Sequence, residues 1–184
     1  MELKQVISLS YEEIIQYILD SRGLSKHPPP VGEVWKILPT QVVELLGCIR
    51  VRDAQVGDFI IPRVSRVERD WTNAVEQLGG GDWIPILIGS TEVGEGIVIS
   101  YNRIGNYCIE PINLVKDGLF MQGEVIALNF DTFLRINLIL DAIKSEDLFE
   151  EGVLNSEGQQ RLLEALKVFY PNFSKSDYWN SWLG

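Results

Sequence analysis

Carboxylates are the most plentiful residues in this chain that could do chemistry, and two close pairs of them are the candidates for acid–base catalysis, although their spacing does not itself favour it. Glu68 lies two residues before Asp70, and Glu92 lies three residues before Glu95. Neighbouring carboxyl groups can act as general acid and base when burial raises one pKa. Each pair, however, falls on a solvated helix face or in a turn. A small carboxylate-using enzyme or ligand-binding domain is therefore the alternative interpretation, and we predict no catalytic residue.

Other reactive side chains are too few for a metal site or a catalytic triad. His27 is the only histidine, and it precedes three prolines, where a loop is expected. Cys48 and Cys108 match no zinc or redox spacing, so both are predicted to be small buried apolar residues. The glycines at 79–81 follow a predicted helix, whereas a phosphate-binding loop precedes one. We predict no metal and no cofactor.

Charge and hydropathy narrow the class of partner. The formal net charge is -10, which opposes binding to nucleic acid or to anionic lipid, because phosphate affinity rests largely on Lys and Arg. A basic protein partner suits this charge better. No run of about 18 uncharged apolar residues is present, and the start "MELKQVISLS" lacks the basic flank and apolar core of a secretory signal. We therefore expect a cytoplasmic protein that does not enter membranes.

Helices are predicted near both ends of the chain and strands in its middle. The capping-box pattern of Ser10 and Glu13 begins a helix that Gly23 ends, and the prolines at 28–30 form an extended connector. The remaining predicted helices are "LPTQVVELLG", "SRVERDWTNAVEQL", the segment that Asn129 caps, "SEGQQRLLEALKVFY" and one turn in the tail. The predicted strands are "CIRV" and "DFIIP" around the turn "RDAQVGD", then the meander "WIPILIG", "GIVISYN" and "NYCIEPI", then "EVIAL".

This order of elements indicates the α+β class. Strands cluster centrally instead of alternating with helices, so we predict a central, largely antiparallel sheet of about five to six strands that helices cover. The length of 184 residues, of which 46% are hydrophobic, is enough for one domain with a full core. We expect a single domain over residues 1–184, with helical extensions at 1–30 and 146–184.

Acidic and aromatic residues bracket the predicted meander and are the candidate partner-binding residues. Asp82, Glu92, Glu95 and Glu110 could steer and match a basic partner, and Trp83 and Tyr107 could anchor it on an exposed face of the sheet. Each residue also has a plain structural explanation. The carboxylates can simply solubilise turns and strand edges, and the two aromatic side chains can pack into the core.

Several of these segments resemble one family. The stretch "LPTQVVELLG", the Trp-led "DWIPILIGSTEVGEGIVISYN" and the strand-to-helix segment "GEVIALNFDTFLRINL" are similar to the SUKH superfamily of Smi/Knr-like domains over residues 38–143. A lone Gly47 and the turn "GSTEVGEG" depart from the family's usual glycine patterns. The resemblance implies a noncatalytic protein-binding module. Many bacterial members are immunity proteins that bind and neutralise a partner toxin, so it also implies a basic toxin as partner.

The C-terminal tail allows a third interpretation. Trp179 and Trp182 lie in the amphipathic stretch from Tyr178 to Leu183. If this stretch inserts into another protein, the chain is a structural or regulatory adaptor. If it docks on the domain's own core, the tail is part of the fold, which is the favoured prediction because exposed tryptophans promote aggregation.

Overall fold

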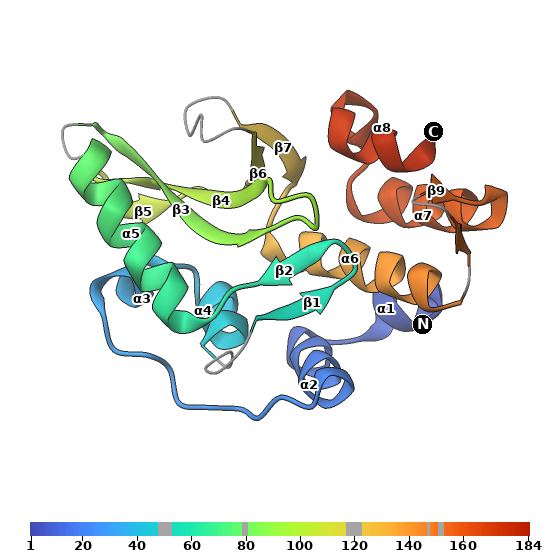
Figure 1. Cartoon of the computed structure of the whole chain (residues 1–184), viewed down its shortest axis with the longest axis horizontal. Coiled ribbons are helices and arrows are strands. Elements are labelled where there is room, and N and C mark those ends of the chain that lie inside the picture. Colours follow the sequence, from blue (N-terminus) through green and yellow to red (C-terminus); the bar gives the residue numbers. More distant parts are fainter. Residues whose placement is uncertain (48–52, 79–80, 117–122, 147, 151–152) are drawn as a thin grey trace.

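A curled antiparallel sheet forms the centre of the molecule, as the computed structural model of the whole chain shows (Figure 1). The structure describes residues 1–47, 53–78, 81–116, 123–146, 148–150 and 153–184. Neighbouring strands follow the order β1, β2, β3, β4, β6 and β7, and β5 pairs with β4 beside that path. The strands are β1 (Ala54–Val56), β2 (Phe59–Ile61), β3 (Trp83–Ser90), β4 (Gly96–Asn102), β5 (Tyr107–Cys108), β6 (Ile112–Val115) and β7 (Glu124–Ala127).

Helices precede and follow this sheet in the chain, and all its strand pairings are antiparallel. The predicted α+β class, the central antiparallel sheet and the helical termini are thus confirmed. The described helices are α1 (Leu3–Ser8), α2 (Tyr11–Arg22), α3 (Glu33–Ile37), α4 (Thr40–Leu46), α5 (Val64–Leu78), α6 (Phe130–Ser145), α7 (Ser156–Phe169), the 3-10 turn η1 (Phe173–Lys175) and α8 (Asp177–Leu183).

The β3–β4 hairpin is the longest part of the sheet. Its pairing runs from Trp83 opposite Asn102 to Ser90 opposite Gly96, with one irregularity near Gly89. A Cβ atom at Gly89 would lie 2.0 Å from the ring of Phe59, so the absence of a side chain at Gly89 allows β2 to approach β3 closely. The predicted strands "WIPILIG" and "GIVISYN" are therefore confirmed, whereas "NYCIEPI" is divided between β5 and β6.

The hairpin before α5 differs from its prediction. Strand β1 lies inside the segment predicted as the turn, and the predicted strand "CIRV" at 48–51 lies outside the described residues. Ala54 and Val56 are buried and Gln55 is exposed, which is the alternation of a half-buried strand. The turn is the two-residue Gly57–Asp58, in which Gly57 has a φ of 61°. Glycine adopts this left-handed conformation without strain.

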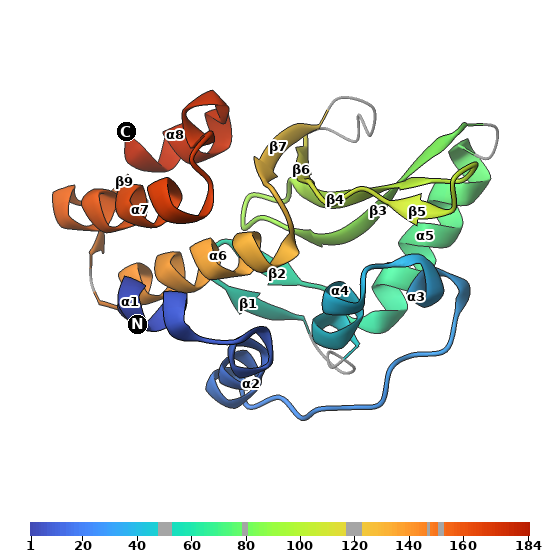
Figure 2. The same cartoon turned by 180° about the vertical axis from the view of Figure 1, so that it is seen from behind.

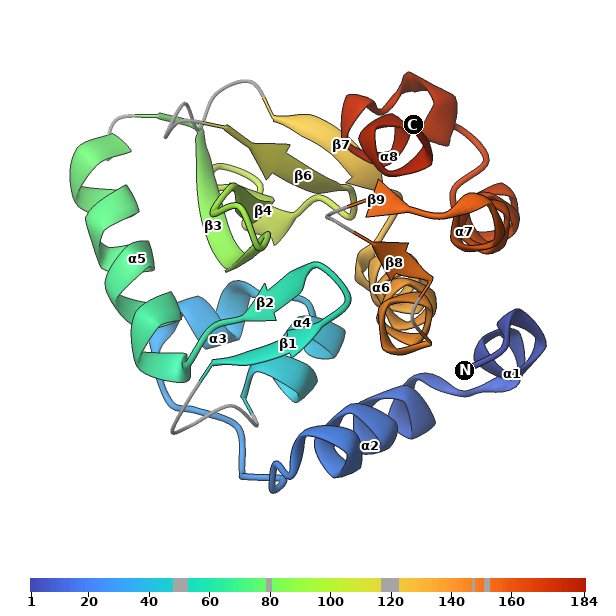
Figure 3. The ribbon, with the colours of Figure 1, turned by 45° about the vertical axis from the view of Figure 1, so that its right-hand side comes forward.

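Helix α6 packs in the interior, against β1, β7, α1, α4 and α7. Phe130 and Phe133 lie on its first two turns, and both rings approach Phe59 of β2 edge-on. The helix begins as predicted, because the Asn129 side chain accepts a hydrogen bond from the Thr132 N–H at 2.9 Å. Figure 3 shows α6, α7 and α8 on the right, by the β7 edge of the sheet, and α5 on the left, beside β3. Among the described helices, none combines the length and apolar character that a membrane span requires.

The N-terminal helices lie across the body of the fold. Helix α2 begins with the predicted capping box, in which Ser10 and Glu13 bond each other's backbone N–H, and Gly23 ends it in a left-handed conformation. The chain then runs as an extended connector to α3 (Figure 2). Helix α7 begins at Ser156, as predicted, and its N-cap is Asn155, whose side chain accepts from the Gly158 N–H at 3.0 Å. A short hairpin, β8 (Phe149–Glu150) with β9 (Val153–Leu154), precedes α7.

The C-terminal tail docks on the domain itself. Trp179 is completely buried, and its indole N–H donates to the Ile126 carbonyl of β7 at 2.6 Å. The Glu124 carboxylate accepts from the Ser176 hydroxyl and from the Tyr178 N–H. These bonds hold α8 against the edge strand of the sheet, which agrees with the prediction that the tail is part of the fold.

Candidate functional site

The six predicted binding residues fall into two groups at opposite ends of the β3–β4 hairpin. Trp83 begins β3, next to Asp82, and Tyr107 and Glu110 lie near β5 at the same end. Glu92 and Glu95 lie in the turn that joins β3 to β4. An eight-residue strand is on the order of 25 Å long. The chain therefore has two separate candidate surfaces, one at each end of the hairpin.

The first surface, the aromatic patch, consists of Trp83 and Tyr107, and the exposed Ile104 lies in the turn between β4 and β5. Asn102 of β4 pairs with Trp83 on one side and with Tyr107 on the other, so the two rings project from the same face of the sheet. The rings meet edge-to-face with centroids 6.1 Å apart. Trp83 is 42% exposed, Tyr107 51% and Ile104 79%. The acidic Asp82 and Glu110 flank the patch in sequence and are exposed.

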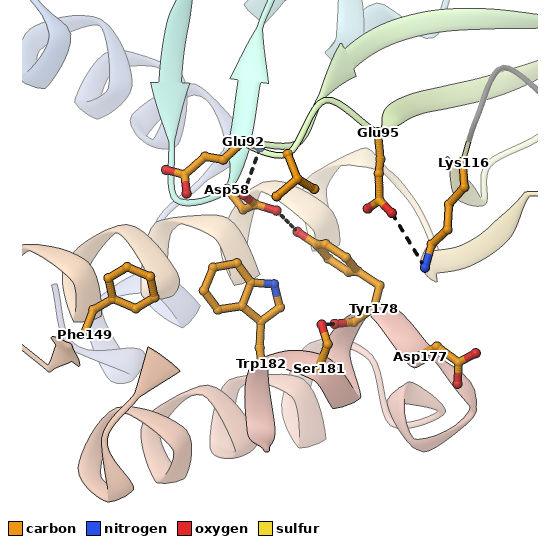
Figure 4. Close-up of a pocket in the computed structure, with 10 residues that line it drawn as sticks. Asp58, Glu92, Glu95, Lys116, Phe149, Asp177, Tyr178, Ser181 and Trp182 are labelled. Atoms are coloured by element: carbon orange, nitrogen blue, oxygen red, sulfur yellow. Dashed lines mark hydrogen bonds and ion pairs between the residues drawn. The ribbon is translucent and has the colours of Figure 1, made fainter. Parts of the chain in front are cut away.

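The second surface, the acidic groove, is a cavity of about 420 Å³ (Figure 4). It lies between the β1–β2 turn, the β3–β4 turn and helix α8. Glu92 and Glu95 point into it from the β3–β4 turn, and Tyr178 and Trp182 face them from α8. Its described lining residues are Asp58, Glu92, Val93, Glu95, Lys116, Phe149, Asp177, Tyr178, Ser181 and Trp182.

Asp58 is the buried centre of the acidic groove. Its carboxylate accepts hydrogen bonds from the Glu92 N–H at 3.1 Å and from the Tyr178 hydroxyl at 2.7 Å. Its own N–H donates to the side chain of Asn137 in α6, which fixes the turn. Burial raises the pKa of the Asp58 carboxyl, although both hydrogen bonds lower it. Burial, followed by the charge of Asp58, raises the pKa of Tyr178 well above its ordinary value.

A cation of the chain itself lies at the Phe149 end of the groove. The Lys144 ammonium is 2.8 Å from the Glu92 carboxylate, 5.2 Å from the Phe149 ring centre and 4.9 Å from that of Trp182. Its side chain is only 15% exposed. One ammonium ion is therefore held by a carboxylate and two aromatic faces together, a combination that favours cations.

At the other end of the groove, the lysines of the chain itself neutralise the carboxylates less completely. Lys116 is 3.6 Å from the Glu95 carboxylate, but its side chain is 58% exposed. Asp177 lies in the first turn of α8, where the helix dipole favours a negative charge. Among the described lining residues, four carboxylates face one lysine. The groove thus has a strongly negative lining.

The carboxylate pairs considered for catalysis are engaged separately. Glu68 accepts from the Trp35 indole at 2.9 Å, while Asp70 lies 3.6 Å from Arg66 and 3.2 Å from Arg69. Glu92 is paired with Lys144 and Glu95 with Lys116, as described above. Within the described ranges, no group of three or more His, Cys, Asp or Glu side chains is placed to hold a metal ion.

His27 and Cys108 line neither the acidic groove nor the aromatic patch, although Cys108 follows Tyr107 directly in β5. His27 is exposed in the connector between α2 and α3. Cys108 is only partly buried, not buried as predicted, because it lies in the short strand β5 next to the exposed Tyr107. Its thiol donates to the Ile37 carbonyl at 3.1 Å, and burial raises its pKa to about 11. Cys48 lies outside the described residues.

No protein family, no characterised protein and no solved structure matches this chain. The SUKH resemblance thus stays a prediction, and function must be argued from the two surfaces.

Sequence reasoning missed most of the acidic groove. It names Glu92 and Glu95 and places Asp58 in a predicted turn, but it assigns no role to Lys144. Tyr178 and Trp182 were recognised as amphipathic tail residues, and that was the one signal available. Nothing local indicates that a residue near position 58 contacts one near position 178, because 120 residues separate them.

Proposed function

We propose that this chain is a noncatalytic protein-binding module whose partner is a basic protein. The observation that carries the proposal is the aromatic patch. An edge-to-face tryptophan–tyrosine pair lies on the surface, at 42% and 51% exposure, beside exposed carboxylates. Tryptophan and tyrosine are the residues most enriched at binding hot spots. Because the rings already support each other, little side-chain entropy is lost on binding.

Charge supports the same kind of partner. The net charge of -10 would steer a basic protein toward the chain over distances of about a Debye length. Asp82 and Glu110 beside the patch would then pair with Lys or Arg at the rim of the interface. Rim charges mainly raise the association rate and exclude wrong partners.

Binding explains the carboxylates better than catalysis does. An acid–base pair needs one carboxyl that is free to exchange protons with a substrate. Glu92 and Glu95 are each paired with a lysine, and Asp58 is held by a tyrosine hydroxyl and a backbone N–H. Asp58 and Glu92 are therefore held in fixed contacts, which favours binding over proton transfer, whereas Glu95 is held only by the exposed Lys116.

We further propose that the module is an immunity protein of the SUKH type, which neutralises a toxin by covering it. The support is the resemblance of residues 38–143 to that superfamily. Neutralisation by contact needs only a complementary surface, which suits an acidic chain opposite a basic toxin. Action in the cytoplasm is part of this proposal, since the free thiol of Cys108 suits a reducing compartment.

The test is calorimetric titration with the products of the two genes adjacent to that of this chain. We expect one product to bind, with lower affinity at 300 mM than at 50 mM NaCl. Trp83→Ala and Tyr107→Ala should each weaken binding at least tenfold. Tyr17→Ala is the matched control, because Tyr17 is 40% exposed on α2, outside both surfaces.

Two results would contradict the proposal. One is that neither adjacent product binds. The other is that a product binds but the patch variants bind it as tightly as Tyr17→Ala does. An assay of the toxin's activity with and without the chain would separate neutralisation from simple binding.

A further inference from the structure

The acidic groove has more negative charge than the chain itself neutralises. Asp58, Glu92, Glu95 and Asp177 line it, and Lys116 is the one cation among its described lining residues. Lys144 approaches from α6 and satisfies Glu92. Lys116 is more than half exposed and lies 3.6 Å from Glu95, so this pair is weak and readily exchanged.

Besides its carboxylates, the groove has aromatic walls, which also favour a positive charge. Tyr178 and Trp182 present rings to the cavity, close to Asp58 and Glu95 (Figure 4). Lys144 already demonstrates this chemistry, since Trp182 and Phe149 together hold its ammonium group beside Glu92. The volume of about 420 Å³ is within the range of ligand sites, so the cavity has room for a side chain of a partner.

We propose that the acidic groove receives a cationic side chain, lysine or arginine, from a basic segment of the partner protein. The side chain would lie against the rings of Tyr178 and Trp182 and pair with Glu95 and Asp177. It would displace Lys116 from Glu95. This inference deepens the proposed function and rests on it, because it assigns a second contact to the same partner, far from the aromatic patch.

A blocked peptide with three arginines separated by glycine and serine is the probe. The same peptide with citrulline in place of arginine is the neutral control, because citrulline keeps the shape of the side chain without its charge. We expect the full-length chain to bind the arginine peptide and not the citrulline peptide. Equal binding of both peptides would overturn the inference.

Matched variants separate the groove from general attraction by net charge. We expect Glu95→Gln/Asp177→Asn to weaken peptide binding about tenfold. The control Glu76→Gln/Asp20→Asn removes the same two charges from exposed helix positions outside the groove, and it should change binding less than twofold. Equal weakening in both double variants would overturn the inference, because net charge alone would explain it.

Lys116→Gln supplies a test in the opposite direction. This exposed substitution should leave the thermal unfolding temperature unchanged and strengthen peptide binding several-fold, because it frees Glu95 from its internal partner. Unchanged or weaker binding would overturn the inference. The difference in peptide binding between the groove variant and its control reports on the groove, and the titration with adjacent gene products reports on the proposed function. Failure of one is therefore distinguishable from failure of the other.

Discussion

Replacing Trp179 with alanine should destabilise the whole domain, although this residue is only five positions from the C-terminus. Its side chain is completely buried, and the indole N–H donates to the Ile126 carbonyl at 2.6 Å. Truncating a buried tryptophan costs about 3–5 kcal/mol, and leaving a buried carbonyl without its donor adds about 1 kcal/mol. We expect a loss of about 4–6 kcal/mol, or roughly 10–20 °C in Tm for a chain of this size.

Two further variants separate the contribution of the indole hydrogen bond from that of burying the ring. Trp179→Phe keeps most of the ring and removes the N–H, so it should cost about 1–2 kcal/mol. Trp83→Ala makes the same chemical change at a residue that is 42% exposed, and it should cost about 1 kcal/mol. Urea unfolding followed by circular dichroism at 222 nm gives the free energy of unfolding for each variant.

The refuting result is a Trp179→Ala loss no larger than that of Trp83→Ala. The tail would then be free of the core in solution, and Trp179 would be available to insert into another protein. The adaptor interpretation would gain support in that case, and the acidic groove, which α8 completes, would lose one wall.

Two further predictions concern titratable groups. The folded pKa of Asp58 is raised above its ordinary value of 3.8, so the native state takes up this proton first as pH falls. The free energy of unfolding of the wild type, relative to Asp58→Asn, should therefore rise as pH falls from the raised pKa toward 3.8. Urea unfolding at several pH values measures this difference. A difference that stays constant or falls as pH falls would contradict the raised pKa of Asp58. The pKa of Cys108 is raised to about 11 from 9.0, so its thiol should react with iodoacetamide at pH 8 at least tenfold more slowly in the native chain than in urea. Peptide mass spectrometry would locate the label. Equal rates in the two states would contradict burial of the thiol.

Long elements were predictable because their signals are local. The apolar stripe of α5 and the caps of α2 and α6 lie within a few residues of the structure they specify. The same holds for β3 and β4, whose apolar runs span seven or eight residues. The α+β class follows from the order of these elements.

Short elements could not be predicted from local sequence patterns. Strand β1 has three residues, and its pairing with β2 around Gly57 depends on contacts that the turn makes with Asn137. Helix α3 and the β8–β9 hairpin were missed for the same reason. Few local residues take part, so the stability of such elements comes from the surfaces on which they pack.

The sequence by itself determined the chemical character of the surface, namely its excess of carboxylates, its few aromatic anchors and the absence of a histidine-rich site. It also determined the long helices and strands, whose hydrogen bonds and apolar faces repeat along the chain. Only the tertiary structure decided which residues are neighbours. It separated Trp83 and Tyr107 from Glu92 and Glu95, and it placed α8 opposite the two hairpin turns. The physical reason is that such contacts form when distant apolar faces are buried together, and burial depends on the assembled fold and not on the residues nearby in the chain.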